Sequence, residues 1–517
     1  KWYRILNYWS ERNISGPKPI PLFGNNLSPV LKPRAMVDME WYNTYGSIYG
    51  VYDCGQPVLY VLDPVLIKQI LVKEFHKFPN RAQIPELSGL ISKSIPRARD
   101  ENWKRIRAIA SPTFTTGKLR HMYPLLNECC HDFLAELDRD VSTSGGHREV
   151  DVKQLMSAYT LDAITSTAFA IKTNSYSDPN NRFITTSNNI AKTIFYTNKW
   201  QKILPMILPT FLTNTRMWKW MAAGGRPDDR YFNDVARRLM SERKKSDQKH
   251  NDFLQLLMDV KREDDTSHTT TGAGDAAEEL RGNEGVDELM AEKQLLSGVL
   301  AKKLTADEIL AQCSTFFTAG YETTALTLTY CTYELAVNPD IQDRLVAEIR
   351  EALNEHNGDI DYETLLRLPL LDAVISETLR KYPTDSRLER QASDDAVLSA
   401  GSDRSTINIS KGMVIKISTY ALHHNPDYFP DPFAFKPDRF LPQNRHNIKP
   451  YTYLPFGSGP RTCLGMRFAL LEVKLGMVNM MQQFRFYRVP DTDVPLVFLR
   501  GSDRLYAKRV VVGVTKR

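Results

Sequence analysis

One glycine-rich string in this sequence holds a cysteine in a setting that suits metal chemistry. It reads Phe456-Gly-Ser-Gly-Pro-Arg-Thr-Cys-Leu-Gly465, with Cys463 near its end. The spacing suits a thiolate bound to haem iron, because such a sulfur pushes electron density toward an oxygen ligand and favours O–O cleavage. Gly459 and Gly465 allow tight backbone turns beside the flat macrocycle. An ordinary buried cysteine in a turn is the alternative, and it would suit a lone Cys-x-Gly better than the whole string.

The neighbours of this cysteine have matching roles. Phe456 would screen the sulfur from water, and Arg461 can reach a propionate carboxylate at the porphyrin edge in a charge-assisted contact. The amides after Cys463 and the positive end of the next helix can stabilise a negative sulfur. The sequence therefore predicts Cys463 as the iron ligand, with Phe456 and Arg461 as further haem contacts.

A second motif, Ala319-Gly-Tyr-Glu-Thr-Thr324, lies inside a long predicted helix. The capping box Thr305-Ala-Asp-Glu308 begins this helix and Pro339 ends it, so its length is about 50 Å. Because Gly320 lacks a side chain and Thr323 can bond to a backbone carbonyl, the helix can open a groove for dioxygen.

Glu322 and Thr323 form an acid–alcohol pair in that motif. Such a pair, usually with ordered water, can relay the protons that oxygen activation consumes. A polar kink in a core helix is the alternative. Phe316, Phe317 and Ala319 would give an apolar wall above the iron, although aromatic residues at this spacing usually belong to a core.

The cysteine string resembles the haem loop of the cytochrome P450 superfamily, and two further motifs follow in that family's order. Glu377-Thr-Leu-Arg380 resembles its Glu-x-x-Arg motif, and the Pro-Asp-Arg-Phe segment around Arg439 resembles the one that completes a buried Glu-Arg-Arg network. One carboxylate facing two guanidiniums is tolerable inside a protein only when every partner is present. The resemblance implies a structural network of Glu377, Arg380 and Arg439.

Longer segments resemble the drug-metabolising family 3 of animal cytochromes P450, and subfamily 3A in particular. Residues 102–118, 387–390, 420–423 and 455–461 carry this resemblance, which runs from about residue 15 to the C-terminus. It implies that five residues contact haem propionates: Arg81, Trp103, Arg107, Arg390 and Arg461. Two buried carboxylates need such donors, and a Trp/Arg pair one helical turn apart presents both on one face. For Arg81, a surface salt bridge is the alternative.

Two stretches depart from the family pattern and bear on the substrate. Thr384, Asp385 and Ser386 stand where the family usually has apolar residues near the haem edge, and the C-terminal turn that begins at Arg500 is also more polar than expected. Charged groups in an apolar pocket normally pair with each other or with a ligand. We therefore expect an amphipathic substrate, with an internal pair between Asp385 and Arg387 as the alternative.

Composition fits one large enzyme domain. The chain has 517 residues, 42% of them hydrophobic and 25% charged. Its motifs must surround one haem, so we expect a catalytic domain over residues 26–517 that follows a juxtamembrane and proline-rich hinge at 1–25. The resemblance implies the cytochrome P450 fold, mainly α with a small β-rich part, with haem between the long helix and the cysteine loop. Residues 48–52 and 58–62 predict a hairpin, and Asp63 begins a helix after it.

Cysteine and charge patterns exclude some classes of protein. The six cysteines show neither Cys-x-x-Cys spacing nor the density of a secreted disulfide scaffold. The formal net charge of +6 is mild and no long basic run accompanies it, so no nucleic-acid partner is expected.

The N-terminus and one internal segment suggest a membrane surface. No apolar stretch reaches about 18 residues, so no transmembrane helix is predicted. The aromatic residues through Trp9 resemble the juxtamembrane end of a microsomal enzyme without its anchor, on the cytoplasmic side of the endoplasmic reticulum membrane. Residues 203–220 have apolar positions with tryptophan and basic borders that suit a membrane interface, with a buried core segment as the alternative. Residues 264–303 read as a mobile surface connection.

These features together predict a haem-thiolate monooxygenase for lipophilic or amphipathic small molecules such as steroids, lipids or xenobiotics. Haem b is the expected cofactor, with electrons from NADPH through NADPH-cytochrome P450 reductase and cytochrome b5 as a further candidate partner. The family places Lys104, Arg105 and Lys118 on the docking face, with a solvated helix face as the alternative. An isomerase of lipid peroxides and a non-enzymatic haem sensor are the other functions considered, and the acid–alcohol pair argues against both.

Overall fold

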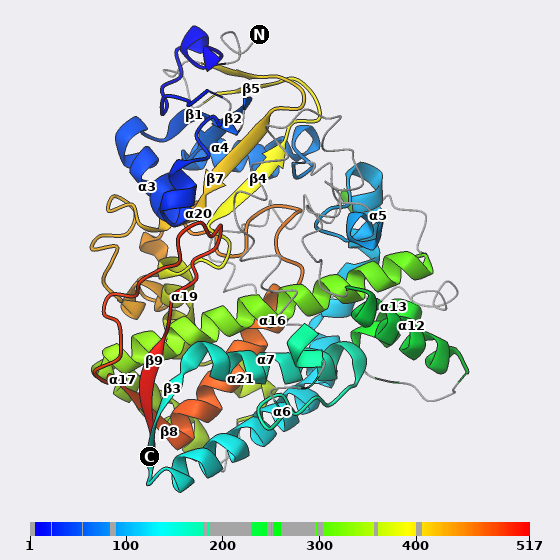
Figure 1. The fold of residues 1–517 in the computed structure, drawn as a ribbon, viewed down its shortest axis with the longest axis vertical. Coiled ribbons are helices and arrows are strands. Elements are labelled where there is room, and N and C mark those ends of the chain that lie inside the picture. Colours follow the sequence, from blue (N-terminus) through cyan, green and yellow to red (C-terminus); the bar gives the residue numbers. More distant parts are fainter. Residues whose placement is uncertain are drawn as a thin grey trace.

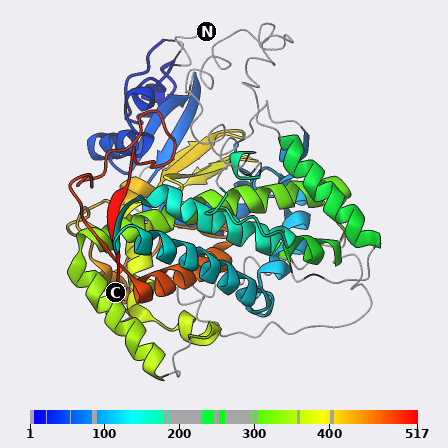
Figure 2. The same cartoon turned by 60° about the horizontal axis from the view of Figure 1, so that its bottom comes forward.

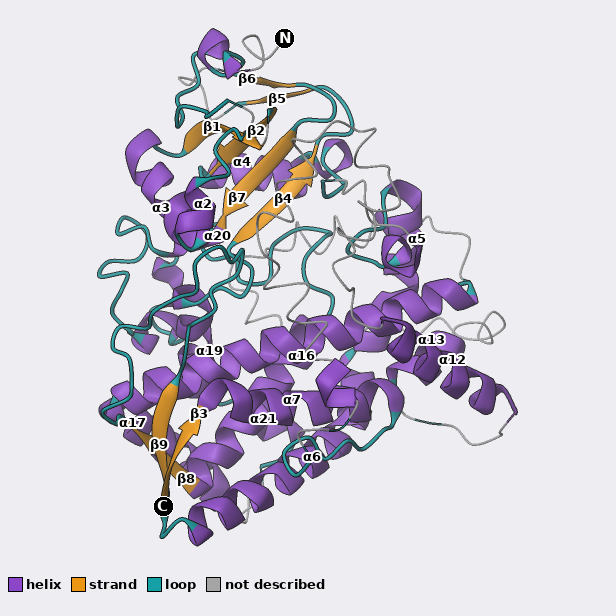
Figure 3. Cartoon of the chain, in the orientation of Figure 1, coloured by secondary structure: helices purple, strands orange, loops and turns teal. Residues whose placement is uncertain are grey.

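The structure of this chain, a computed structural model, has a sheet-rich region at the top of Figure 1 and a larger helical region below it. Figure 3 shows the same division by secondary structure. The predicted mainly helical fold with a smaller β part is confirmed. The described residues are 6–21, 23–53, 55–82, 89–178, 181, 183–186, 229–245, 250, 252–259, 295–296, 303–355, 360–399 and 406–517. The predicted membrane-interface segment 203–220 and nearly all of 264–303 lie outside them.

α-Helices make up most of the described secondary structure. Their bounds are α2 Ser28–Leu31, α3 Arg34–Tyr45, α4 Pro64–Lys68, α5 Asp100–Ala110, α6 Thr116–Thr143, α7 Val152–Phe169, α12 Asp229–Lys245, α13 Phe253–Asp259, α16 Ala306–Val337, α17 Pro339–Glu355, α18 Tyr362–Leu366, α19 Pro369–Lys381, α20 Thr419–His423 and α21 Met466–Gln483. Among the described helices, none is long and apolar enough to cross a membrane.

The α16 helix confirms the ends predicted from the sequence. At its start, the Thr305 side chain accepts a hydrogen bond from the Glu308 amide, and the Glu308 carboxylate accepts one from the Thr305 amide at 2.8 Å. This reciprocal pair satisfies two amides that helix geometry leaves without partners. At the other end, Asn338 caps the helix directly before Pro339. Figures 1 and 2 show α7 running beside α16 through the middle of the helical region.

The described strands form three small sheets, and the predicted hairpin is confirmed. Their strands are β1 Ile48–Asp53, β2 Gln56–Val61, β3 His147–Asp151, β4 Arg387–Gln391, β5 Ala396–Leu398, β6 Ile407–Ile409, β7 Val414–Ser418, β8 Phe484–Tyr487 and β9 Val511–Lys516. The main sheet has the order β1-β2-β7-β4, in which β2 and β7 are parallel; the others are β3-β9-β8 and β5-β6. As predicted, Asp63 caps the helix after the hairpin by accepting bonds from two amides of α4.

The segment before the main sheet belongs to the folded core. Trp9 is 3% exposed, and its indole donates a hydrogen bond to the Val51 carbonyl at 3.0 Å. A Cβ on Gly50 would lie 2.3 Å from that indole, so β1 needs glycine there. Asn25 fastens the proline-rich stretch to β1, because its side chain accepts from the Tyr52 amide at 2.8 Å. Trp9, the last aromatic residue of the segment that resembles a juxtamembrane end, is therefore packed in the core of the protein.

Candidate active site

The predicted cysteine loop forms a tight turn against the main sheet region. The Cys463 amide donates to the Phe456 carbonyl at 2.9 Å, which closes the loop. Gly459 has φ +71°, and a Cβ there would lie 2.1 Å from the Leu71 carbonyl oxygen, so only glycine fits. Gly465, by contrast, has φ −89° and directly precedes α21. Gly465 thus lies in a turn as predicted, but of these two glycines only Gly459 has a backbone conformation that requires glycine.

Cys463 is an exposed residue, whereas the other described cysteines, Cys129, Cys130, Cys313 and Cys331, are buried. Burial among protein groups raises the pKa of the Cys463 thiol, while the Gly465 amide and the charge of Arg107 lower it. A thiol in this setting suits a metal, because coordination to a metal ion deprotonates a thiol outright.

Arginine side chains gather beside this loop. Arg461 donates from Nη2 to the Ala98 carbonyl at 2.8 Å, and its guanidinium carbon lies 4.4 Å from the centre of the buried Trp103 ring. Arg107, on the same helix as Trp103, donates to the Thr462 carbonyl at 2.9 Å. The structure therefore brings three of the five predicted propionate contacts to one place.

The other two, Arg81 and Arg390, join the same group. Burial, with the charges of Arg390, Arg81 and Arg107, lowers the pKa of Arg461 to about 8. Burial and Arg81 likewise lower the pKa of Arg390 to about 9, and the Nε atom of Arg390 is buried without a hydrogen-bond partner. Within the described chain, no ion pair neutralises Arg81, Arg390 or Arg461. The two carboxylates of haem would supply the missing negative charge, so these residues fit that cofactor.

Two arginines of this cluster escaped the sequence analysis. Arg99 donates to the Arg81 carbonyl and to Gln391, each at 3.0 Å. Arg97 lies two residues earlier, and no hydrogen bond or ion pair of its side chain is seen among the described residues. Both follow Pro96 in a short turn before α5, and a run of alternating arginines is the only sequence signal that marks them.

The Glu-Arg-Arg motif forms a buried ionic network. Arg380 donates to both Glu377 oxygens, at 2.6 and 2.9 Å, and both side chains are fully buried. Arg439 Nε lies 3.4 Å from Glu377 Oε1, which also accepts from the Lys436 amide at 2.9 Å. The carboxylate thus meets two guanidiniums, as a stable buried pair requires.

His423, whose role the sequence analysis missed, extends this network toward the cysteine loop. Arg380 donates to the His423 carbonyl at 2.8 Å, and the His423 Nε2 atom accepts from the Leu454 amide at 2.8 Å. Burial and the charge of Arg380 lower the pKa of His423 to about 3, so the neutral ring accepts this bond. The network therefore reaches the chain nine residues before Cys463.

The accessible side of α16 contains Ala319 and Thr323. Ala319 is exposed, and Thr323 Oγ1 donates back to the Ala319 carbonyl at 2.6 Å, as predicted. The helix nevertheless continues without a break through both residues. Gly320 faces α7, where a Cβ would lie 2.8 Å from Ile164 Cδ1. Its lack of a side chain therefore permits close helix packing, and the prediction that Gly320 opens a groove is wrong.

Glu322 points away from Thr323 and toward α7. Its side chain is 2% exposed, and its Oε1 lies 3.1 Å from the Lys153 Nζ. Lys153 is partly exposed and also donates to Ser157 at 3.0 Å. The acid and the alcohol are thus neighbours in sequence, but the structure pairs the acid with a lysine that the sequence analysis did not consider.

Two aromatic residues predicted for the pocket wall lie in the core. Phe316 packs edge-on against Phe114 with ring centres 5.2 Å apart. Phe317 packs against Phe232 at 4.6 Å and is 2% exposed. Phe114 also lies 3.8 Å from where a Gly465 Cβ would stand, so it joins α16 to the cysteine loop. The predicted apolar wall therefore keeps only Ala319.

The two polar stretches do meet, but through other partners than expected. Asp385 pairs with Arg504 at 3.0 Å, while Arg387 pairs with Asp503 at 3.0 Å. Although burial opposes its charge, Asp385, Tyr506 and Glu322 together raise the pKa of Arg504 above its ordinary value. Both the predicted role of Arg500 and the alternative Asp385–Arg387 pair are thereby corrected, since Arg504 is the cation that meets the acid.

The other predicted polar pocket residues, Thr384, Ser386 and Arg500, take no part in these two ion pairs. Ser386 Oγ donates to the Asp503 carbonyl at 2.8 Å, so it ties β4 to the C-terminal turn. Thr384 is half-buried, and Arg500 is exposed. A substrate role of Ser386 would require its hydroxyl to leave this bond.

Two of the three cations predicted for the reductase docking face, Lys104 and Lys118, remain available to bind a partner. Lys118 is exposed, and Lys104 forms a surface pair with Glu101 at 2.6 Å, which contributes little. Arg105 instead pairs with Glu308 at the start of α16 and donates to the Lys303 carbonyl at 2.7 Å. The prediction that Arg105 is a free docking cation is wrong.

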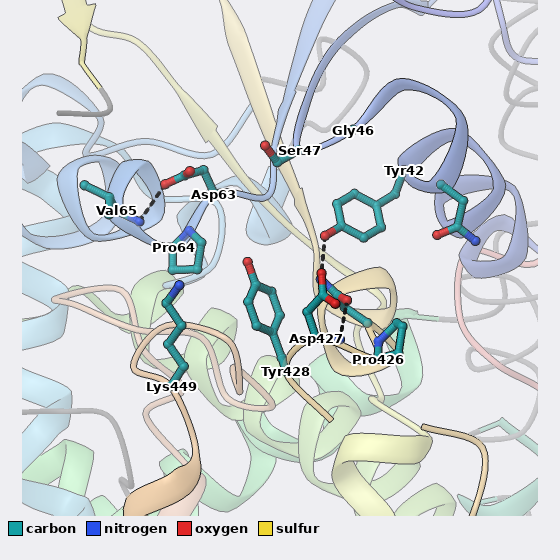
Figure 4. A pocket seen from close by; sticks show the side chains of 12 residues that line it. Tyr42, Gly46, Ser47, Asp63, Pro64, Val65, Pro426, Asp427, Tyr428 and Lys449 are labelled. Carbon is teal, nitrogen blue, oxygen red and sulfur yellow. Dashed lines mark hydrogen bonds between the residues drawn. The ribbon is translucent and has the colours of Figure 1, made fainter. Parts of the chain in front are cut away.

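A surface cleft of about 500 Å³ lies elsewhere, between the end of α3, the start of α4 and the turn after α20 (Figure 4). Asn425 donates to the Tyr42 hydroxyl at 2.6 Å at its edge, and Lys449 lies over the Tyr428 ring. None of the predicted site residues lines it. Its lining brings together no nucleophile–base pair and no cysteine, so the site at Cys463 remains the candidate.

Comparison with known proteins agrees with this geometry. The family model for cytochrome P450 matches residues 14–505. Cytochrome P450 3A11 of Mus musculus is 36% identical over 511 residues, which cover 98% of this chain and 92% of the relative. Cytochrome P450 3A2 of Rattus norvegicus is 35% identical, with coverages of 98% and 92%. Cytochrome P450 3A7 of Homo sapiens is 35% identical, with coverages of 99% and 93%.

Proposed function

Since this chain belongs to the cytochrome P450 family, whose members are haem-thiolate monooxygenases, we propose that Cys463 is its iron ligand and that it oxidises lipophilic or amphipathic small molecules. The exposed cysteine beside Arg81, Arg390 and Arg461, for which the described residues provide no ion pair, carries this proposal. Haem b, when bound, supplies the electron transfer and oxygen activation. The protein supplies the thiolate, the charges that hold the propionates, and the residues that move protons.

The arginine cluster supports the cofactor role of these residues. Burial first, and then the like charges around them, lower the pKa values of Arg390 and Arg461, and two propionates would offset both effects. Trp103 can donate from its indole, and its ring supports Arg461. Phe456 is half-buried and its carbonyl holds the Cys463 amide, so it fixes the loop whether or not its ring also screens the sulfur.

Thr323 is the residue best placed to position a proton donor on the accessible side of α16. Its hydroxyl already donates to Ala319, so its oxygen remains available to accept from a water molecule. Glu322 can contribute only after it leaves Lys153, which lies 3.1 Å away. We therefore assign Thr323 the position in the proton path nearer the haem, and Glu322 a position farther from it.

Replacing Thr323 with alanine should divert reducing equivalents from product to hydrogen peroxide. The expected loss of product per NADPH lies within the range of general acid catalysis, about 10²–10⁴-fold at most. Haem binding and substrate binding should persist, because among the described residues no other side chain bonds to this hydroxyl. Thr318→Ala is a matched control, since Thr318 makes the same bond back to Ser314 at 2.8 Å. Equal coupling in wild type and Thr323→Ala would refute the role.

We propose that electrons come from NADPH through a flavoprotein reductase that docks at Lys104 and Lys118. Complementary charge mainly raises the association rate and is screened by salt. Lys104→Glu with Lys118→Glu should slow reduction by about tenfold at low salt, and less at high salt. Lys244→Glu with Lys245→Glu reverses the same charge at the end of α12 and serves as the control. An unchanged low-salt rate would place the docking face elsewhere.

The reaction class has its own direct test. Purified protein, reductase and NADPH would be incubated under ¹⁸O₂ with a panel of steroids, fatty acids and drugs. We expect products that carry one ¹⁸O atom. Rearrangement of a lipid hydroperoxide without NADPH, and no labelled product from any compound, would favour an isomerase instead.

We further propose that the protein is located on the cytoplasmic side of the endoplasmic reticulum membrane. The aromatic and basic residues of the N-terminal segment support this location.

A further inference from the structure

The turn before α5 spans the distance between the long helix and the cysteine loop. On one side, the Ile95 amide donates to Gln312 of α16 at 2.8 Å. On the other, the Ala98 carbonyl accepts from Arg461 at 2.8 Å. Arg97 lies between these two fixed points. Its position is therefore set by the same two elements that frame the candidate active site.

Unlike Arg99 and Arg461, Arg97 has no hydrogen-bond acceptor among the described residues. Arg99 has two, the Arg81 carbonyl and Gln391, and Arg461 donates to the Ala98 carbonyl. Arg97 is only partly exposed, and within the residues that the structure describes its guanidinium makes no hydrogen bond or ion pair. Burial and the charge of Arg81 lower its pKa, and only Glu389 opposes them. The described residues thus place Glu389 near this guanidinium but provide no anion in contact with it.

The haem carboxylates do not account for this residue. By the proposal above, the two propionates would already be met by four other guanidiniums, those of Arg81, Arg107, Arg390 and Arg461. The Nε of Arg390 is buried without a hydrogen-bond partner and would be one donor to them. Arg97 adds a further positive charge to a cluster that already exceeds the charge of the cofactor. A third carboxylate would stabilise it.

We propose that Arg97 anchors the carboxylate of an amphipathic substrate beside the haem site, and that long-chain carboxylic acids are therefore a substrate class of this protein. The inference rests on the proposed function, because it places the ligand in that same site. The other polar groups there neutralise one another, since Arg504 pairs with Asp385 and Lys153 with Glu322. Arg97 is thus the cation that can discriminate an acid from its neutral ester.

The test uses ferric protein with haem bound and measures spectral binding constants for dodecanoate and methyl dodecanoate. Arg97→Gln should weaken dodecanoate binding by about tenfold and leave the ester unchanged within about twofold. Arg97→Lys should recover part of the loss because it keeps the charge. Lys93→Gln is the matched control, since Lys93 is an exposed cation in the same turn that pairs with Asp307 at 2.7 Å.

A haem propionate could supply the same carboxylate chemistry, so the rate of haem transfer to apomyoglobin is measured in parallel. Faster haem loss in Arg97→Gln, with the ratio of acid to ester binding unchanged, would assign Arg97 to the cofactor and overturn the substrate role. Equal weakening of acid and ester, or no weakening, would also overturn it.

The inference and the proposed function fail in different ways. If the reduced carbon monoxide complex keeps its strongly red-shifted Soret band and the ester binds, the haem-thiolate assignment stands even when Arg97 has no effect. Loss of that band in wild-type protein would instead remove the proposed function itself.

Discussion

Replacing Arg380 with methionine is expected to cost about 3–5 kcal/mol of folding free energy and to give protein that retains little haem. Glu377 is fully buried and receives two short bonds from Arg380. Without them the carboxylate keeps only the Lys436 amide and the more distant Arg439. A buried charge that has lost its main partner is among the largest single destabilising changes.

Urea unfolding and haem content would measure this loss. Arg344→Met is a suitable control, because it removes an arginine whose ion pair with Asp438, at 2.6 Å, is exposed on both sides. The double variant Glu377→Leu with Arg380→Met should be more stable than Arg380→Met alone, since it removes the stranded charge as well. If Arg380→Met folded and bound haem like wild type, the network would not be structural.

Cys463→Ser is expected to abolish the thiolate spectrum and to lower the oxygenase activity by about 10²-fold or more. The reason is that a serine oxygen cannot supply the same electron density to iron. The fold should survive, since the Cys463 amide, not its sulfur, closes the loop onto Phe456. Absorption spectra, circular dichroism and turnover would be compared.

Cys129→Ser is the matched control for this variant. Cys129 lies on α6 and is buried and free, so its replacement changes a sulfur that has no access to the site. The control should keep both spectrum and activity. A Cys463→Ser protein with wild-type spectrum and activity would exclude this cysteine as the ligand.

Local signals in the sequence predicted the elements of this site well. The ends of α16 follow from a capping box and a proline, both of which act within one turn of the chain. The pairing of Glu377 with Arg380 follows from helical spacing, and the hairpin from two apolar runs around a turn. Each depends on residues that are near neighbours along the chain.

Partners across elements were the harder part. Helical periodicity shows that Gly320 and Phe317 lie on α16, but only packing decides that the first faces Ile164 and the second faces Phe232. Glu322 has its lysine on α7, about 170 residues away along the chain, and no local pattern joins them. The choice of Arg504 over Arg500 likewise depends on how the C-terminal turn lies against β4.

The central claim, that Cys463 binds haem iron as a thiolate, has one direct measurement. The wild-type protein would be reduced, exposed to carbon monoxide and examined in the Soret region. A strongly red-shifted band, lost in Cys463→Ser and kept in Cys129→Ser, is the predicted result. A band typical of imidazole ligation in folded, active wild-type protein would contradict the account.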